Sequence, residues 1–309
     1  MDPRDGSVKA SPDDEGKRLD VFLSSVSGLS RSRAQALISA GLALVDGRPA
    51  RKNHVVVVSE EIAWSVPAPV TEDVIPQKIP LDIVYEDEHL VVVDKPPGMV
   101  MYPGHGHPGD TLVNALVSRY PDIAGVGGQG RPGIFHRLDR DTSGLVAVAR
   151  SEATYQRMVE MVRERAVERI YIALVTGDVP ATRGTIDAPM GRSVDNRKRM
   201  AVRQFGGREA VTRFRVKERF SDGYTLVEVS LETGRTHQIR VHFAHIGHPV
   251  AGDPEYSRGR GGRELELSRQ FLHAHRLSFE HPVTGERLDL KSELPDDLAR
   301  VLKSLGERP

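Results

Sequence analysis

Four prolines interrupt the chain between Val66 and Pro80, in a stretch that shows no apolar periodicity. Proline fixes the backbone angle φ and has no amide hydrogen, so this stretch fits neither a helix interior nor a central strand. We therefore predict a linker at residues 68–80, between a small domain (17–67) and a large one (81–309). Residues 1–16 are acidic and polar, and we expect them to be disordered.

The small domain has the pattern of two helices followed by a small sheet, and we class it as α/β. Apolar residues at helical spacing follow Arg18, Ser30 can cap a second helix, and Gly41 can end it. Asp46-Gly47 marks a turn beside a strand. The predicted elements are helices at 18–23 and 31–40 and strands at 42–45 and 55–58.

The large domain alternates short strands with few helices. Two apolar runs, 83–85 and 90–93, flank an acidic turn and predict a hairpin. Asp110 and Ser151 can each cap a helix. Neighbouring strands with few helices between them indicate an α+β domain with a mixed, largely antiparallel sheet. The further strands that we predict lie at 145–149, 171–175, 211–216, 224–231 and 271–279.

The composition excludes several classes of site and of location. The chain has no cysteine, which excludes disulfides, thiolate metal sites and cysteine nucleophiles and fits a reducing compartment. The first sixteen residues contain no apolar signal region, and no later apolar run approaches the roughly 20 residues that cross a bilayer. We expect a cytoplasmic protein without a membrane partner.

The net charge is zero, with 43 basic and 43 acidic residues, so the distribution of charge is more informative than its sum. Residues 183–219 hold eleven basic side chains against four acidic ones. A basic working face for nucleic acid and an ordinary solvated charge run both fit this segment.

The segment His136-Arg-Leu-Asp-Arg-Asp-Thr-Ser-Gly-Leu145 combines a carboxylate with flanking arginines on a polar turn before a strand. Asp139 stands between Arg137 and Arg140. From the residues alone, a reactive carboxylate and an arginine-paired turn residue both remain open.

The same segment resembles the HRLDxxTSG signature of the RluA/RluD-type pseudouridine synthases. Tyr171 begins a stretch similar to the second motif of that family, and residues 233–242 are similar to the third. The seam from Leu37 to Arg48 resembles the S4 RNA-binding module. Tyr102 is a departure, because histidine is common there in the family.

The resemblance implies a set of site residues. Asp139 would be the nucleophile, Tyr171 would stack on the target base, and Arg240 would grip both oxygens of the Asp139 carboxylate. It also implies substrate contacts from Arg137, Arg140, Thr142, Arg235 and His237. In the S4-like domain, Arg31, Arg33, Arg48, Arg51 and Lys52 would face phosphate.

The implied function is isomerisation of uridine to pseudouridine, which needs neither a metal nor an organic cofactor. We expect the partner to be RNA, in particular large-subunit ribosomal RNA or an assembling large ribosomal subunit, and the enzyme to be a monomer. Transfer RNA remains an alternative substrate. A non-catalytic S4-type RNA chaperone is a second class of function, and a glycoside hydrolase using Asp139 with a second carboxylate is a third.

Two other patterns are weaker. Gly125-Val-Gly-Gly-Gln-Gly130 matches GxGxxG, but Pro121 lies upstream where a strand should be and Pro132 follows where a helix should begin, so we expect no nucleotide cofactor. The triplet His242, His245 and His248 lacks the spacing of a zinc helix, and we interpret these histidines as surface or RNA-contacting residues.

Overall fold

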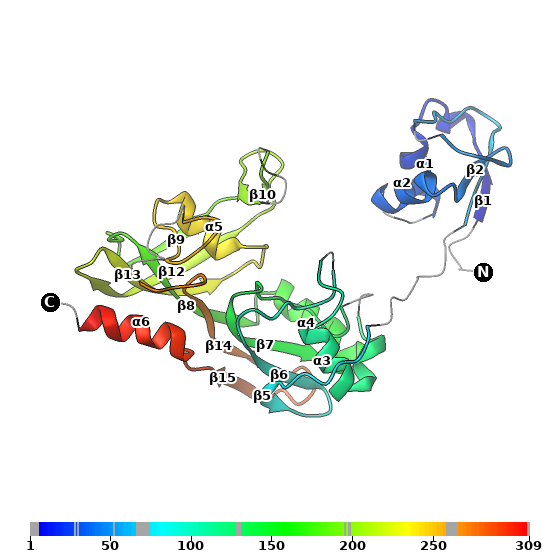
Figure 1. The fold of residues 1–309 in the computed structure, drawn as a ribbon. Helices are drawn as coiled ribbons and strands as arrows, with labels where there is room; N and C mark the ends of the chain where they lie inside the picture. Colours follow the sequence, from blue (N-terminus) through cyan, green and yellow to red (C-terminus); the bar gives the residue numbers. More distant parts are fainter. Residues whose placement is uncertain are drawn as a thin grey trace. The chain divides into compact units, whose positions relative to one another are not determined.

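A computed structural model describes residues 6–27, 29, 31–51, 53–65, 74–104, 106–127, 131–194, 196, 199–257 and 265–307 (Figure 1). The chain divides into two compact units, Met1–Thr71 and Glu72–Pro309. Among the described residues, every helix is too short or too polar to cross a bilayer.

The small unit packs two helices on one sheet. Its helices are α1 (Leu19–Ser27) and α2 (Arg31–Ser39), and Phe22, Leu37 and Trp64 belong to its core. The antiparallel sheet has the order β1-β4-β2-β3. Its strands are β1 (Gly6–Lys9), β2 (Ala43–Val45), β3 (Arg48–Pro49) and β4 (Glu61–Trp64), and a short 3-10 turn, η1, spans Pro12–Asp14.

Two predictions for this unit are wrong. Residues 6–9, expected to be disordered, form β1 and pair with β4, because an edge strand needs only one apolar face and Gly6 lets the Trp64 ring lie against its backbone. The strand expected at 55–58 lies instead at Glu61–Trp64. Val55 and Val57 are about half exposed, and a turn with Ser59 at positive φ separates them from β4.

The expected linker is shorter than predicted. Residues 68–73 lie outside the described part of the chain. Residues 74–80 have no regular structure but lie against α3 (Leu112–Arg119): Asn114 Nδ2 donates to Ile75 O, and Asp110 N donates to Gln77 Oε1. These contacts assign residues 74–80 to the large unit.

The large unit is built on a nine-stranded sheet in the order β5-β6-β7-β14-β8-β13-β12-β9, with β15 on β14. Every pairing is antiparallel except that of β14 with β7, which confirms the mixed, largely antiparallel prediction. The strands are β5 (Asp82–Glu86), β6 (Leu90–Lys95), β7 (Ser143–Ala149), β8 (Glu168–Thr176), β9 (Arg183–Asp187), β12 (Val211–Phe220), β13 (Tyr224–Leu231), β14 (Leu272–Glu280) and β15 (Arg287–Lys291). A separate hairpin joins β10 (Met190–Arg192) to β11 (Met200–Val202).

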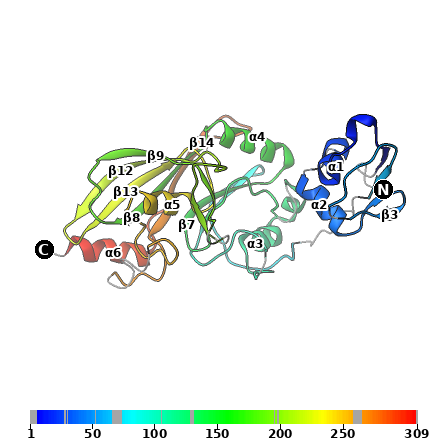
Figure 2. The same ribbon diagram turned by 90° about the horizontal axis from the view of Figure 1, so that it is seen from above.

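Helices cover both faces of this sheet (Figure 2). Tyr171, Ala173 and Val175 of β8 pack in one core with α3 and α5 (Gln238–His245). Ile172 and Leu174 point the other way and pack with α6 (Asp296–Gly306). A third core on β6 and β7 holds α4 (Glu152–Arg163). The face that carries α5 is the one to which Tyr171 belongs.

Helix capping was predicted with mixed success. Ser151 caps α4, and its hydroxyl accepts a hydrogen bond from Thr154 N, as expected. The cap of α3 is Thr111 rather than Asp110, because Thr111 Oγ1 accepts from Asn114 N while Asp110 adopts positive φ. A 3-10 turn, η2 (Pro121–Gly125), follows α3 where the glycine-rich pattern begins, and residues 128–130 lie outside the described chain.

Candidate active site

Asp139 lies on a short loop that leads into β7. Its backbone oxygen accepts from Thr142 N at 3.2 Å, which closes a turn. Lys95, which is fully buried, donates to Arg140 O at 3.0 Å, and Arg269, 5% exposed, donates to Asp141 O at 3.0 Å. Two buried basic side chains therefore hold the two carbonyls that directly follow Asp139.

Each of these basic side chains has further anchors. The Lys95 ammonium also donates to Pro96 O and Met99 O, so all three of its hydrogens have an acceptor. Burial lowers the pKa of Lys95 to about 7, although the nearby acidic residues oppose that shift. Arg269 donates from Nε and Nη2 to the carboxylate of Asp297, at the start of α6.

Arg240 joins Asp139 to a second carboxylate. It lies on α5 and is 4% exposed, and its Nη1 donates to Asp139 Oδ2 at 3.2 Å. Its Nε and Nη2 donate to Asp253 at 2.7 and 3.0 Å. The bidentate grip that we expected on Asp139 is therefore on Asp253, because the Nε and Nη2 edge of the guanidinium points at the buried Asp253 and Asp139 is reached from Nη1 alone. Burial alone would lower the pKa of Arg240, but these carboxylates raise it.

One oxygen of Asp139 is left open. Among the described residues Oδ1 accepts no hydrogen bond, and His237 Nε2 lies 3.9 Å from it. His237 precedes α5 with a left-handed backbone (φ 59°), and its Nδ1 lies 2.9 Å from Tyr256 Oη. Burial lowers the pKa of His237, so the ring is neutral near pH 7. Among the described residues, Arg240 is then the charged group paired with the Asp139 carboxylate.

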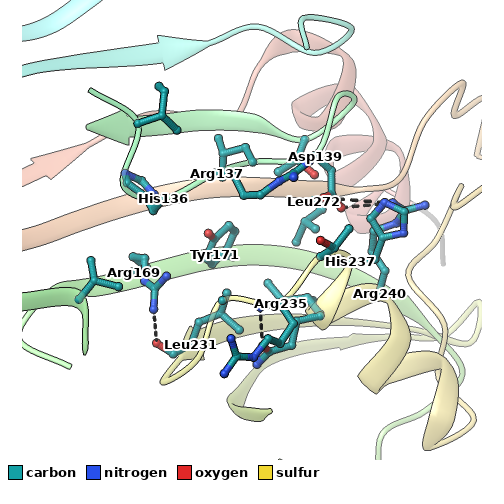
Figure 3. Close-up of a pocket in the computed structure, with 18 of the residues that line it drawn as sticks. His136, Arg137, Asp139, Arg169, Tyr171, Leu231, Arg235, His237, Arg240 and Leu272 are labelled. Carbon is teal, nitrogen blue, oxygen red and sulfur yellow. Dashed lines mark hydrogen bonds and ion pairs between the residues drawn. The ribbon is translucent and has the colours of Figure 1, made fainter. Parts of the chain in front are cut away.

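A cavity of about 300 Å³ opens beside these groups (Figure 3). That volume lies at the lower end of the range for small-molecule pockets. Its wall combines apolar side chains with many polar and charged ones, five arginines among them. The lining includes Leu138, Asp139, Arg169, Tyr171, Leu231, Arg235, His237, Arg240 and Leu272.

Tyr171 lies in the wall of this cavity and is 5% exposed. Burial raises the pKa of its hydroxyl, the charge of Asp139 adds to the increase, and Arg169 opposes it. The phenol is therefore protonated at neutral pH and is unsuited to act as a base. Its ring remains available as a stacking surface.

The expected substrate-binding residues divide into two groups. Arg137, Thr142, Arg235 and His237 line the cavity. Arg140 does not, and its Nε donates to Gly98 O at 3.2 Å. Arg137 donates to Tyr102 Oη, and the guanidinium carbon of Arg131 lies 4.5 Å from the Tyr102 ring centre. Tyr102 thus gathers two exposed arginines at the rim of the cavity.

Of the expected phosphate-binding residues of the small unit, Arg31 is already bonded to a carboxylate of the same unit. Arg31 Nε donates to Asp20 at 2.9 Å, and Arg18 and Gln35 donate to the same buried carboxylate. Arg48 and Arg51 are exposed. Lys52 lies outside the described residues, and of Arg33 the structure describes only its place on α2.

The basic run 183–219 is less positive than its sequence suggests. On β12, Arg213 pairs with Glu232, and Arg215 pairs with Glu228 at 3.0 Å. Arg219 pairs with Asp178 at 2.9 Å. These neighbours come from other strands and turns, and sequence distance hides them. His242 also differs from expectation: it is buried, and its two ring nitrogens lie 2.9 Å from Thr212 Oγ1 and 3.0 Å from Ala188 O.

Three site residues were missed from the sequence. Asp253 holds Arg240, and Arg169 lies in the cavity wall. His136 accepts a hydrogen bond from Ala147 N at Nε2 and ties the Asp139 loop to β7. The available signal for Arg169 was its position two residues before Tyr171, which places both side chains on one face of a strand.

Comparisons with known proteins match both units of the chain to known families. Residues 89–245 match the family model for RNA pseudouridylate synthase, and residues 17–62 match that for the S4 domain. A protein of Chloroflexus aurantiacus, described as an uncharacterized RNA pseudouridine synthase, is 47% identical over 97% of this chain and 94% of its own length. Ribosomal large subunit pseudouridine synthase D of Pseudomonas aeruginosa is 43% identical over 94% of this chain and 93% of its own length.

Solved structures give the same result for the large unit. Human RNA pseudouridylate synthase domain containing 4 superimposes with a TM-score of 0.58 at 25% identity, and the match covers 74% of this chain and 94% of that one. Human RNA pseudouridylate synthase domain containing 1 gives a TM-score of 0.56 at 27% identity over 75% of this chain.

Proposed function

The chain belongs to the RNA pseudouridylate synthase family and carries an S4 domain, and from this premise we propose that it isomerises uridine in large-subunit ribosomal RNA with Asp139 as the nucleophile. Uridine isomerisation is the activity of the family. The choice of ribosomal RNA is supported by relatives named ribosomal large subunit pseudouridine synthase D.

The observation that best supports Asp139 as the nucleophile is that only one of its two carboxylate oxygens is hydrogen-bonded by a described residue. Oδ2 is fixed by Arg240 at 3.2 Å, whereas Oδ1 accepts no hydrogen bond from any described residue. A nucleophilic carboxylate needs both features, because one oxygen must set the aim and the other must be free to attack.

The reaction has to detach uracil and return it to the same ribose. In the simplest sequence, Asp139 forms a bond to C1′ as the N1–C1′ bond breaks, and the electron pair of that bond leaves with the base. The base then turns, C5 forms a bond to C1′, and the carboxylate is released. Finally C5 loses its proton and N1 gains one, so the product is an isomer of the substrate.

Two other features of the cavity suit this reaction. A paired base must leave its helix to reach Asp139, and Tyr171 offers an aromatic face to receive it. Arg137 and Arg131 lie exposed at the rim around Tyr102, where a phosphate of the distorted strand would meet them. Because the Tyr171 hydroxyl is protonated at neutral pH, a group other than Tyr171 must remove the C5 proton.

The S4 domain supplies the second RNA contact of this proposal. Asp20 holds Arg18 and Arg31 by hydrogen bonds of 3.0 and 2.9 Å, and both arginines keep about half of their side-chain surface exposed. Arginines fixed in this way lose less freedom when they bind phosphate. Transfer RNA offers the same phosphates, so this contact does not select the substrate.

We further propose that the enzyme works as a monomer in the cytoplasm. The support for one copy is that Asp139, Tyr171 and Arg240 line one cavity of a single chain. The support for the compartment is the substrate, since ribosomal RNA of bacteria like the named relatives is made there. Sedimentation equilibrium across a range of protein concentrations tests the first point.

The deciding experiment measures tritium release from C5-tritiated uridine in RNA of a strain that lacks this gene. Wild-type protein and Asp139→Asn are compared on separated ribosomal and transfer RNA. Release from the large-subunit RNA by wild type alone supports both parts of the proposal. Release from transfer RNA instead would identify transfer RNA as the substrate. Equal release by Asp139→Asn would show that Asp139 is not the nucleophile. Tight RNA binding without release by either protein favours the chaperone alternative.

A further inference from the structure

Arg169 is a buried cation that pairs with no carboxylate of the described residues. Three arginines of the described chain are buried: Arg169, Arg240 and Arg269. Arg240 holds Asp253 and Arg269 holds Asp297, each through two N–H groups. Arg169 makes one hydrogen bond, from Nη2 to Leu231 O at 3.4 Å, and its Nε has no partner among the described residues. An unpaired buried charge destabilises a fold, so its presence calls for a ligand.

The guanidinium of Arg169 lies in the wall of the cavity that contains Asp139. Arg169 and Tyr171 are two residues apart on β8 and project from the same face. In the view of Figure 3, Tyr171 stands between Arg169 and Asp139. Gly234 makes room for this arrangement, because a Cβ at that position would lie 2.9 Å from Arg169 Nη1.

The depth of Arg169 separates it from the arginines that suit phosphate. Arg131 and Arg137 are exposed at the rim, whereas Arg169 is 6% exposed among apolar side chains such as Leu231. A phosphodiester attached to the strand is reached from the rim. The group that enters the cavity is the base, and the acceptors that uracil offers are its two carbonyl oxygens.

Negative charge develops on those oxygens during the proposed reaction. Breaking the N1–C1′ bond leaves the electron pair on N1, and resonance spreads it to O2 and O4. Attack at C6 instead would push the C5–C6 electron pair towards O4. A fixed cation in a water-poor site stabilises such charge strongly.

We propose that Arg169 is a catalytic residue that binds a carbonyl oxygen of the flipped uracil and stabilises the negative charge that the base carries while it is detached. The inference rests on the proposed uridine isomerisation and adds to it an electrophilic group on the base side of the cavity. Asp139 and Arg240 act on the ribose side. Arg169 is then retained for catalysis although its burial costs stability.

The test compares Arg169→Met with Arg276→Met in single-turnover tritium release, at enzyme excess, on ribosomal RNA from the strain lacking the gene. Arg276 is the matched control, because it lies on the neighbouring β14 and pairs with Asp289 on the surface. We expect Arg169→Met to lower the rate constant roughly 100- to 1000-fold, the usual effect of removing one donor from an anion-stabilising site. The dissociation constant for RNA should stay at the wild-type value. The melting temperature should equal that of the wild-type protein or exceed it.

A merely structural arginine predicts the opposite pattern, with a lower melting temperature and an unchanged rate constant for the folded fraction, and that result would overturn the inference. Two variants keep the charge if Arg169→Met fails to fold. Arg169→Lys and Gly234→Ala, which crowds Nη1, should each slow release about tenfold. Wild-type rates in both would also overturn the inference. Absence of release by the wild-type protein from any RNA overturns the proposed function itself.

Discussion

Arg240 donates from Nε and Nη2 to Asp253 and from Nη1 to Asp139. The guanidinium is therefore oriented by Asp253, which is 1% exposed, and its Nη1 group is aimed at a carboxylate that faces the cavity. Asp253 also accepts hydrogen bonds from the backbone of Glu255 and Tyr256. The position of the proposed nucleophile thus depends on a residue 13 positions beyond Arg240 in the sequence.

Asp253→Asn should slow single-turnover isomerisation. The amide offers one acceptor oxygen instead of two, so the guanidinium loses its fixed orientation, and a misplacement of about 1 Å costs roughly 100-fold in rate. Asp289→Asn is the control, because it breaks a similar bidentate pair with Arg276 on the surface. Loss of a buried partner also lowers stability by about 3–5 kcal/mol, so rates are measured well below the melting temperature. Equal rates in the two variants would contradict the role of Asp253.

Arg240→Lys should be at least as slow as Asp253→Asn. A lysine ammonium is a point charge and cannot hold a carboxylate with two parallel N–H groups while donating a third. We expect a loss of about 100-fold or more, with RNA affinity unchanged, since Arg240 is buried behind the reacting carboxylate. Wild-type single-turnover rates in Arg240→Lys would show that the orientation of Asp139 comes from elsewhere.

Much of this site was predictable because its residues lie in short, dense motifs. The strand after Asp139, the capping of α4 by Ser151 and the hairpin of β5 with β6 all follow from local patterns. The bidentate partner of Arg240 was not predictable. An arginine between two carboxylates can fork onto either, and only packing decides that Asp253 receives two N–H groups and Asp139 one.

The unpredicted features share a physical cause, because each depends on contacts between residues that are far apart in the sequence. The sequence does not indicate that Arg169 is buried or that it pairs with no carboxylate of the described residues. β1 is polar because it is an edge strand with one exposed face, and polar composition resembles disorder. Glu228 and Glu232 neutralise the basic run of β12 only because β13 pairs with it.

Asp297→Asn should slow turnover although Asp297 lies on the C-terminal helix. Arg269 donates to Asp297 through Nε and Nη2 and to Asp141 O through Nη1 at 3.0 Å, so the helix fixes the loop that carries Asp139. We expect a loss of about tenfold in the single-turnover rate with unchanged RNA affinity. Asp296→Asn removes the same charge one residue away on an exposed position and should have no effect. Similar rates in both variants would limit α6 to a structural role.

Acidification should destabilise the fold through His136. Its burial, with the charge of Arg169, lowers its pKa to about 3, so the folded state binds fewer protons than the unfolded state between pH 6.5 and 3. Stability therefore falls as the pH decreases through this window, by about 1.4 kcal/mol per pH unit for one proton. His136→Gln should flatten the slope by most of that amount in urea titrations above about pH 5.5, where carboxylates of ordinary pKa are largely ionised. His107→Gln, at an exposed position, serves as control, and an unaltered slope in His136→Gln would contradict the assignment.

Removing the S4 domain should weaken RNA binding more than chemistry. The larger unit, Glu72–Pro309, has its own core and contains every residue that lines the cavity, so it should still isomerise uridine in a short RNA. Arg18 and Arg31 would be lost with residues 1–71, and each lost phosphate contact reduces the slope of log K against log salt by about 0.7 to 0.9. We therefore expect the slope of log K against log salt to be lower for the shortened protein by at least one such step. Its single-turnover rate at saturating RNA should lie within about threefold of that of the full chain.

Asp20→Asn in the full chain provides an intermediate, because it keeps every arginine but frees Arg18 and Arg31 from their shared carboxylate. Identical salt slopes for the full and shortened proteins would place the RNA contacts on the catalytic unit alone.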